Sequence, residues 1–294
     1  MEGVERRPDE PEPWRQFVHF PLVALVIAVG LFLVAARIGD TLGSAILVHS
    51  DVSRTLARNA VVLATVLLTY KVAIARLGEA PRDDLTVKQA WPNLGIGILL
   101  GFLLMALSVG VAAVVHVYDF IGEGDSSQLV NALVTSAIMP AFMEETLFRG
   151  ILFRWIEEFA GSWIALLVTA ALFGLVHLRN PGATSFSTLA LALEAGILLG
   201  AAYMMTRSLW LPMGLHAAWN FTEGEVFDVP VSGIPEHGLF QARMSGPELL
   251  TGGAFGLEAS IIAVVIATGA GVWFVCLAVR RGQVVQPWWV RRLG

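Results

Sequence analysis

Two adjacent carboxylates and an arginine, Glu144, Glu145 and Arg149, stand in an apolar stretch of this chain. A charged side chain in the hydrocarbon interior of a membrane costs roughly 2.5–3.5 kcal/mol on insertion scales, so such residues usually mark a functional site with partners nearby. Two further apolar segments carry His177 and His216 as candidate partners. A carboxylate beside histidines can take a proton from water, and the pattern therefore predicts a hydrolytic site inside a membrane.

The positions of Glu144 and His177 suggest that these two residues meet. They lie at equal distances along the chain from a short break at residues 159–162. If the segments on either side of the break form an antiparallel helical hairpin, equal offsets give equal depth, because both helices rise about 1.5 Å per residue. Glu144 can then face His177 and serve as a general base toward a water molecule.

Two pairs of polar residues have the spacing of one helical turn. Glu145 and Arg149 suit an internal ion pair with a mainly structural role, which makes both charges tolerable. His216 and Asn220 share one helical face. An imidazole and a carboxamide both donate hydrogen bonds to developing negative charge, so this pair predicts an oxyanion site.

Together these residues form three motifs in a fixed order: Glu-Glu-x-x-x-Arg at 144–149, Phe-x-x-x-His at 173–177 and His-x-x-x-Asn at 216–220. The set resembles the signature of the CAAX protease and bacteriocin-processing family (CPBP, also called Abi) of intramembrane proteases. The resemblance covers roughly residues 132–221 and implies a membrane-embedded endopeptidase. Carried over by position, it implies the catalytic residues Glu144 as the base, His177 as the holder of the water, and His216 with Asn220 as the oxyanion site, supported by Glu145, Arg149 and Phe173.

The resemblance leaves two alternatives open for a cofactor. Members of this family are usually described as metalloproteases, and a metal-free water activated by glutamate has also been argued for them. Glu144, His177 and His216 would make an open zinc site with a water in the fourth position. The His-Glu-x-x-His pattern of better-known zinc proteases is absent from the sequence.

The composition is typical of a polytopic membrane protein. The chain has 294 residues, of which 56% are hydrophobic and 15% charged, against about 25% charged in soluble domains. A single cysteine, Cys276, excludes an internal disulfide framework, and the absence of a basic stripe gives no support for nucleic-acid binding. The expected partners are membrane lipid and a peptide or protein substrate with a membrane-associated segment.

We predict an all-α integral membrane protein with eight transmembrane helices around a buried polar site. The apolar runs lie at residues 17–36, 56–75, 94–115, 128–148, 163–177, 186–205, 209–221 and 257–279. The GxxxG spacings at Gly97/Gly101 and Gly196/Gly200 predict close helix contacts. Glu194 lies inside the sixth run but outside the motifs, and it is a second-tier candidate that either lines the site or bonds to a neighbouring helix.

The predicted organisation has five parts: a cytoplasmic polar leader (1–16), the first three helices (17–127), a CPBP-like catalytic core (128–222), an external loop (223–256), and the last helix with a basic tail (257–294). Lysine and arginine are concentrated in the segments that this order places inside, which predicts that both termini are cytoplasmic. The excess of arginine over lysine hints at a bacterial source, and hence at the bacterial cytoplasmic membrane.

Three functions compete. The first is hydrolysis of a peptide bond near the membrane, such as leader-peptide processing, signal-remnant processing or bacteriocin self-immunity. The second is a non-catalytic scaffold or bacteriocin-immunity factor of the same fold, in which Glu144 forms a structural ion pair and His216 with Asn220 holds helices together. The third is a proton-coupled transporter that uses Glu144, Glu194 and the histidines as a relay, although no inverted repeat is visible in the sequence.

Overall fold

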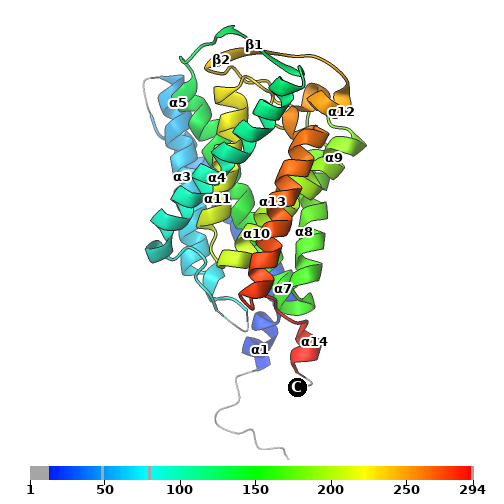
Figure 1. Ribbon diagram of the computed structural model, residues 1–294. Coiled ribbons are helices and arrows are strands. Elements are labelled where there is room, and N and C mark those ends of the chain that lie inside the picture. Colours follow the sequence, from blue (N-terminus) through cyan, green and yellow to red (C-terminus); the bar gives the residue numbers. More distant parts are fainter. Residues whose placement is uncertain (1–12, 48–49, 79–80, 293–294) are drawn as a thin grey trace, which may run out of the picture.

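The computed structural model describes residues 13–47, 50–78 and 81–292. Most of the predicted leader (1–16) lies outside these residues, and only its last four belong to the first helix, α1 (Pro13–His19). The helices form one bundle, with the two-stranded sheet at one end and both α1 and the C-terminal helix α14 at the other (Figure 1).

In chain order the helices and strands are α1, α2 (Pro21–Ser44), α3 (Asp51–Val72), η1 (Ile74–Arg76), α4 (Val87–Val114), β1 (Tyr118–Glu123), α5 (Leu129–Ala132), η2 (Leu133–Ile138), α6 (Met139–Glu145), η3 (Thr146–Phe153), α7 (Arg154–Ala160), α8 (Ser162–His177), α9 (Ser185–Leu191), η4 (Ala192–Gly196), α10 (Ile197–Thr206), α11 (Trp210–Phe221), η5 (Thr222–Val226), β2 (Phe240–Met244), α12 (Glu248–Thr251), η6 (Gly253–Phe255), η7 (Leu257–Ala259), α13 (Ile261–Arg280) and α14 (Trp288–Arg291).

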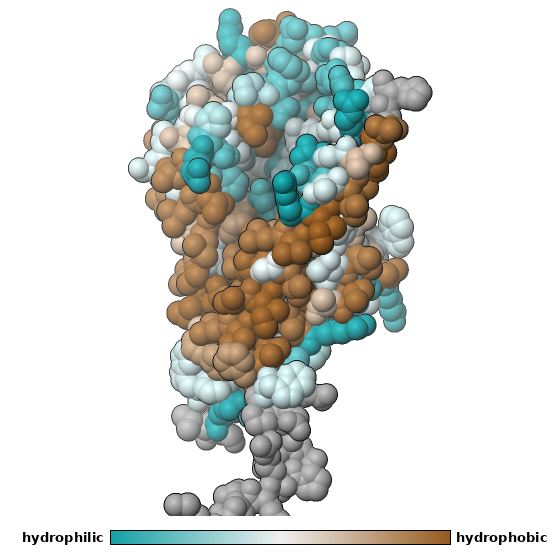
Figure 2. Space-filling model, turned by 180° about the vertical axis from the view of Figure 1, so that it is seen from behind, coloured by the Kyte–Doolittle hydropathy of each residue, from teal (hydrophilic) through white to brown (hydrophobic). Residues whose placement is uncertain are grey.

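The chain is a mostly helical integral membrane protein. A broad apolar band covers the side of the bundle, with hydrophilic residues gathered at the end that carries the sheet (Figure 2). Large apolar side chains such as Val26 and Leu68 are more than half exposed. In the described segments, five helices are long and apolar enough to cross a membrane: Pro21–Ser44, Asp51–Arg76, Val87–Val114, Ser185–Thr206 and Ile261–Arg280.

Three of the eight predicted spans are not among these five helices. The apolar helix α8 has 16 residues, which at about 1.5 Å per residue falls short of a hydrocarbon core of about 30 Å. α11 has 12 residues, and the segment from α5 to α7 alternates between α-helical and π-helical turns. The predicted number of eight transmembrane helices therefore stays a prediction. The first span begins at Pro21 rather than at residue 17, because proline suits the first turn of a helix.

A small antiparallel sheet closes one end of the bundle, and the sequence analysis did not predict it. Tyr118 of β1 pairs with Met244 of β2, and Glu123 pairs with Phe240. The strand β2 belongs to the segment predicted as an external loop, so this loop packs against the chain that precedes the predicted core. Short, largely exposed strands of five and six residues lack the long alternating pattern that would have predicted them.

Both predicted GxxxG contacts are confirmed. A Cβ at Gly97 would lie 2.4 Å from the carbonyl oxygen of Leu211, and one at Gly101 would lie 2.3 Å from that of Leu215. These glycines therefore let α4 approach the backbone of α11, the helix that carries the third motif. Gly196 makes the same kind of contact with α8, where a Cβ would lie 2.7 Å from the Cα of Ala170.

A saturated polar cluster lies toward the end of the bundle opposite the sheet. Its centre is the fully buried Asp84. The hydroxyls of Tyr70 and Tyr203 donate to Oδ2 of Asp84 at 2.9 and 3.0 Å, and Arg82 Nε donates to Oδ1 at 2.6 Å. Arg154 lies 3.9 Å from the same carboxylate. This Asp84 cluster fastens the connection between α3 and α4 to α7 and α10.

Candidate active site

The predicted hairpin brings Glu144 and His177 together. The chain turns between α7 and α8 at Gly161, whose φ of +85° is a conformation that favours glycine. Glu144 Oε2 and His177 Nε2 end 3.9 Å apart, which agrees with the equal-depth argument. This distance is too long for a direct hydrogen bond and suits a single bridging water molecule.

The surroundings of this pair leave its reactive atoms free. His177 Nδ1 lies 2.7 Å from the carbonyl oxygen of Phe173, so Nδ1 carries the proton and Nε2 presents its lone pair. The Glu144 side chain is 29% exposed, and its Oε2 atom is buried without a hydrogen-bond partner. A carboxylate oxygen and an imidazole nitrogen that both lack a protein partner can accept hydrogen bonds from one water.

Glu145, Arg149 and His216 form a buried charged triad. Arg149 Nη1 donates to Glu145 Oε1 at 2.7 Å, and both side chains are fully buried, which confirms the predicted ion pair. His216 Nδ1 lies 3.0 Å from the same oxygen, so Glu145 also orients the imidazole and directs Nε2 away from itself. The Arg149 guanidinium further donates to the carbonyl of Ala195 at 3.0 Å and lies over the ring of Phe173. Sequence spacing had predicted the pair but not the orientation of His216.

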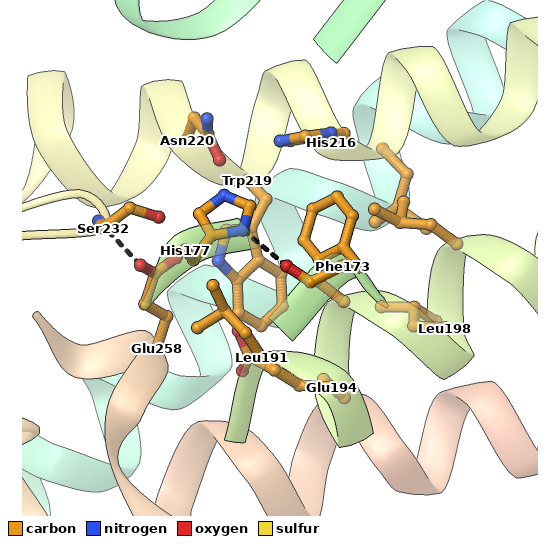
Figure 3. Close-up of a pocket in the computed structure, with 14 residues that line it drawn as sticks. Phe173, His177, Leu191, Glu194, Leu198, His216, Trp219, Asn220, Ser232 and Glu258 are labelled. Atoms are coloured by element: carbon orange, nitrogen blue, oxygen red, sulfur yellow. Dashed lines mark hydrogen bonds between the residues drawn. The ribbon is translucent and has the colours of Figure 1, made fainter. Parts of the chain in front are cut away.

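His216 and Asn220 come from one face of α11 and line the same cavity (Figure 3). Asn220 donates one Nδ2–H to the carbonyl of Ser136 at 3.1 Å. A carboxamide has two N–H donors, and this hydrogen bond uses one of them. The structure thus places both predicted oxyanion donors beside His177, while their assigned roles stay predictions.

The cavity beside these residues is small and mixed in polarity. His177, His216, Asn220, Glu194 and Glu258 supply its polar lining. Its interior of about 30 Å³ has room for a water molecule. Glu194, the second-tier candidate, therefore lies at the predicted site, whereas Glu144 is not one of the lining residues and lies next to His177.

The predicted zinc ligands do not form a metal centre in the observed arrangement. Within the described segments, no three histidine, cysteine, aspartate or glutamate side chains are placed to hold one metal ion. The Nδ1 atoms of His177 and His216 contact the Phe173 carbonyl and Glu145, which leaves the Nε2 atoms as their candidate ligand atoms. We therefore derive no step through a metal from Glu144, His177 and His216, and zinc remains an alternative that a metal analysis would test.

Sequence analysis missed two acidic residues next to this cavity. Glu258 is 4% exposed, and its Oε1 accepts a hydrogen bond from the backbone N–H of Ser232 at 2.6 Å. The backbone N–H of Glu258 in turn donates to Oε1 of Glu223 at 3.0 Å. Both glutamates stand at the ends of apolar segments, and that position was the signal that could have indicated them.

Comparison with known proteins supports the family that the motifs predicted. Residues 126–222 match the family described as type II CAAX prenyl endopeptidase Rce1-like. A Bacillus subtilis (strain 168) protein named "Putative membrane peptidase YdiL" is 25% identical over 198 residues, which are 63% of this chain and 76% of that protein. No solved structure matches the chain. The matched segment contains all three motifs, and both similarities support the CAAX protease and bacteriocin-processing family.

Proposed function

We propose that this protein is an intramembrane endopeptidase that hydrolyses a peptide bond in a membrane-associated protein or peptide. The observation that carries the proposal is the 3.9 Å separation of Glu144 Oε2 and His177 Nε2, and neither atom has a hydrogen-bond partner among the described residues. The family of residues 126–222 and the name of the Bacillus relative support a protease rather than a scaffold or a transporter.

The proposed reaction uses a water held between Glu144 and His177. Glu144 takes a proton from this water, and the resulting hydroxide adds to the carbonyl carbon of the substrate. The oxyanion that forms accepts a hydrogen bond from the free Nδ2–H of Asn220 and one from a His216 imidazolium, whose other N–H is held by Glu145. Glu144 then gives its proton to the leaving amine as the carbon–nitrogen bond breaks.

The proposed location is the bacterial cytoplasmic membrane with both termini in the cytoplasm. The helices α1 and α14 lie at the same end of the bundle, which supports the placement of both termini on one side (Figure 1). The hydrophilic end with the sheet would then face outward, and the predicted external loop (223–256) contributes β2 to that end.

The test is cleavage of membrane-anchored reporter peptides by purified protein in lipid vesicles. Mass spectrometry should show two products whose summed mass exceeds that of the substrate by one water. His177→Ala is expected to abolish cleavage, whereas His237→Ala, in the loop at the hydrophilic end, is the matched control and should cleave at the parent rate. Equal cleavage by His177→Ala and the parent protein would contradict the proposal, and zinc at one equivalent in active protein would favour the metal alternative.

A further inference from the structure

Three buried carboxylates beside the catalytic residues take no part in the proposed reaction. Glu194, Glu223 and Glu258 are 1%, 0% and 4% exposed. They come from three separate short elements, η4, η5 and η7. Glu194 and Glu258 line the same cavity as His177 (Figure 3). Glu223 adjoins Glu258, whose backbone N–H donates to its Oε1.

These carboxylates lack the arginine partner that three other buried acids in the described residues have. Glu145 is paired with Arg149, Glu157 with Arg207, and Asp84 with arginine. Throughout the described part of the chain, no lysine or arginine forms an ion pair with any of the three carboxylates.

Two oxygen atoms of this group are buried without any hydrogen-bond partner, namely Oε2 of Glu194 and Oε2 of Glu223. Burial, together with the neighbouring charge of Glu258, raises the pKa of Glu223 well above its ordinary value. Unpartnered buried polar atoms are costly and rare in folded proteins. Among the described residues, Oε2 of Glu194 is therefore an acceptor in the cavity lining that the chain itself does not satisfy.

A ligand that supplies positive charge and several donors would complete this arrangement. An ammonium group has three N–H donors and no acceptor, and it is compact, whereas a guanidinium is a wide planar fork. The cavity interior of about 30 Å³ suits the compact group. A metal ion fits less well, because no three acidic or histidine side chains in the described residues are placed around one point.

We infer that the cavity beside His177 is a specificity subsite that binds the ammonium of a substrate lysine side chain through Glu194 and Glu258. The inference rests on the proposed function, since it names the substrate feature that the same site recognises. Glu223 supports the subsite by holding the backbone of Glu258.

The experiment uses the full-length protein in vesicles and a series of membrane-anchored reporter peptides. A single lysine is moved along the peptide one position at a time, and each peptide is matched with one that carries norleucine there. At one position lysine is expected to raise kcat/KM about tenfold or more over norleucine, as for hydrogen bonds between charged groups. An arginine at that position should be cleaved more slowly than lysine, and equal or faster cleavage of the arginine peptide would contradict the choice of an ammonium.

Variants then connect the preference to the two carboxylates. In Glu194→Gln and Glu258→Gln the lysine-to-norleucine ratio is expected to fall toward one, whereas Leu191→Met, at another lining position, should keep the parent ratio. If a variant is folded but inactive, its binding affinities for the lysine and norleucine peptides are compared instead of kcat/KM. An unchanged preference for lysine over norleucine in both variants would overturn the inference.

The two proposals fail in different ways. Cleavage by the parent protein with no lysine preference at any position would refute the subsite and leave the protease intact. Tighter binding of the lysine peptide without cleavage of any peptide would refute the protease and leave the subsite.

Discussion

The Asp84 cluster and the cavity beside His177 are both buried and charged, but they differ in how completely their polar atoms are paired. Both oxygens of Asp84 receive hydrogen bonds, from two tyrosines and an arginine. Around the cavity, Oε2 atoms of Glu144, Glu194 and Glu223 have no partner. Because satisfied buried networks rigidify a fold and unsatisfied groups cost free energy, the first region is expected to stabilise the bundle and the second to bind something.

The backbone conformation also differs between the two regions. Glu194 and Glu223 lie in the π-helical segments η4 and η5, and Arg149 lies in η3. Asp84 lies in the connection between α3 and α4, outside any helix. Single π-helical turns occur often at functional sites, since the wider turn redirects side chains at some cost in stability. The helices around the cavity thus deviate from regular geometry where they carry the candidate residues.

The largest expected effect is a loss of activity when Glu144, next to the cavity, is replaced. Glu144→Gln removes the proposed base and should lower kcat about 10²–10⁴-fold, the usual contribution of a general base. Its thermal unfolding temperature should stay close to that of the parent, because Oε2 of Glu144 has no partner to lose. A large drop in stability with normal activity would reverse the assignment of this residue.

The opposite result is expected for the Asp84 cluster. Asp84→Asn removes the carboxylate that pairs with Arg82 and should lower the free energy of unfolding by about 3–5 kcal/mol, as for other broken buried pairs. The cleavage rate per folded molecule should be retained. The neighbouring Asp83→Asn is the control, because its pair with Lys71 is about 40% exposed and should contribute at most about 1 kcal/mol. Denaturation in detergent measures both variants.

A smaller effect is expected where α4 supports the helix of the third motif. Gly101→Ala places a methyl group 2.3 Å from the carbonyl oxygen of Leu215 and should cost about 1–3 kcal/mol of stability, as overpacking does. It should also slow cleavage, because α11 carries His216 and Asn220. Gly110→Ala on the same helix is the matched control, since nothing lies within 4 Å of the added methyl group. Equal stability of the two variants would mean that the close approach is not needed.

The smallest effect concerns Glu225, which lies in η5 just beyond the cavity. Burial, followed by its hydrogen bond and charge interaction with Glu236, raises the pKa of Glu225 to about 7 from an ordinary value of 4.5. Between these values the folded protein binds more protons than the unfolded chain, so the free energy of unfolding falls as pH rises through this range. Well below pH 4.5 Glu225 is protonated in both the folded and the unfolded chain, so it does not lower the free energy of unfolding. Well above pH 7 it is ionised in both, and the decrease in the free energy of unfolding is complete.

Glu225→Gln isolates this contribution. The variant should match the parent in unfolding temperature at about pH 4 and become relatively more stable by about pH 8, where the parent has lost stability. A constant difference across the pH range would show that Glu225 does not titrate in this window.

Several features of the fold and site could be read from single residues and spacings. The equal offsets of Glu144 and His177 from the break at residues 159–162 predicted their contact, because a helical hairpin converts sequence distance into depth. The i,i+4 spacing predicted the Glu145–Arg149 pair. The glycines at 97 and 101 predicted the close contact of α4 with α11 before their partner was known.

The sheet and the lengths of several helices were beyond such reasoning. β1 and β2 are separated by more than a hundred residues, and neither has a strong alternating pattern. Their pairing depends on the bundle bringing the two segments to the same end (Figure 1). The π-helical turns in the segment from α5 to α7 were likewise not predicted from the sequence.

The sequence by itself determined the class of the protein, because an apolar chain with few charges must form helices that satisfy their own backbone in lipid. It also indicated the family that the comparisons support, since three motifs of chemically specific residues occur in a fixed order. Only the tertiary structure decided that Glu145 orients His216, and that Glu194 and Glu258 line the cavity with no ion pair to a lysine or arginine among the described residues. These contacts join residues from distant helices, and their distances depend on how the helices pack rather than on any local spacing.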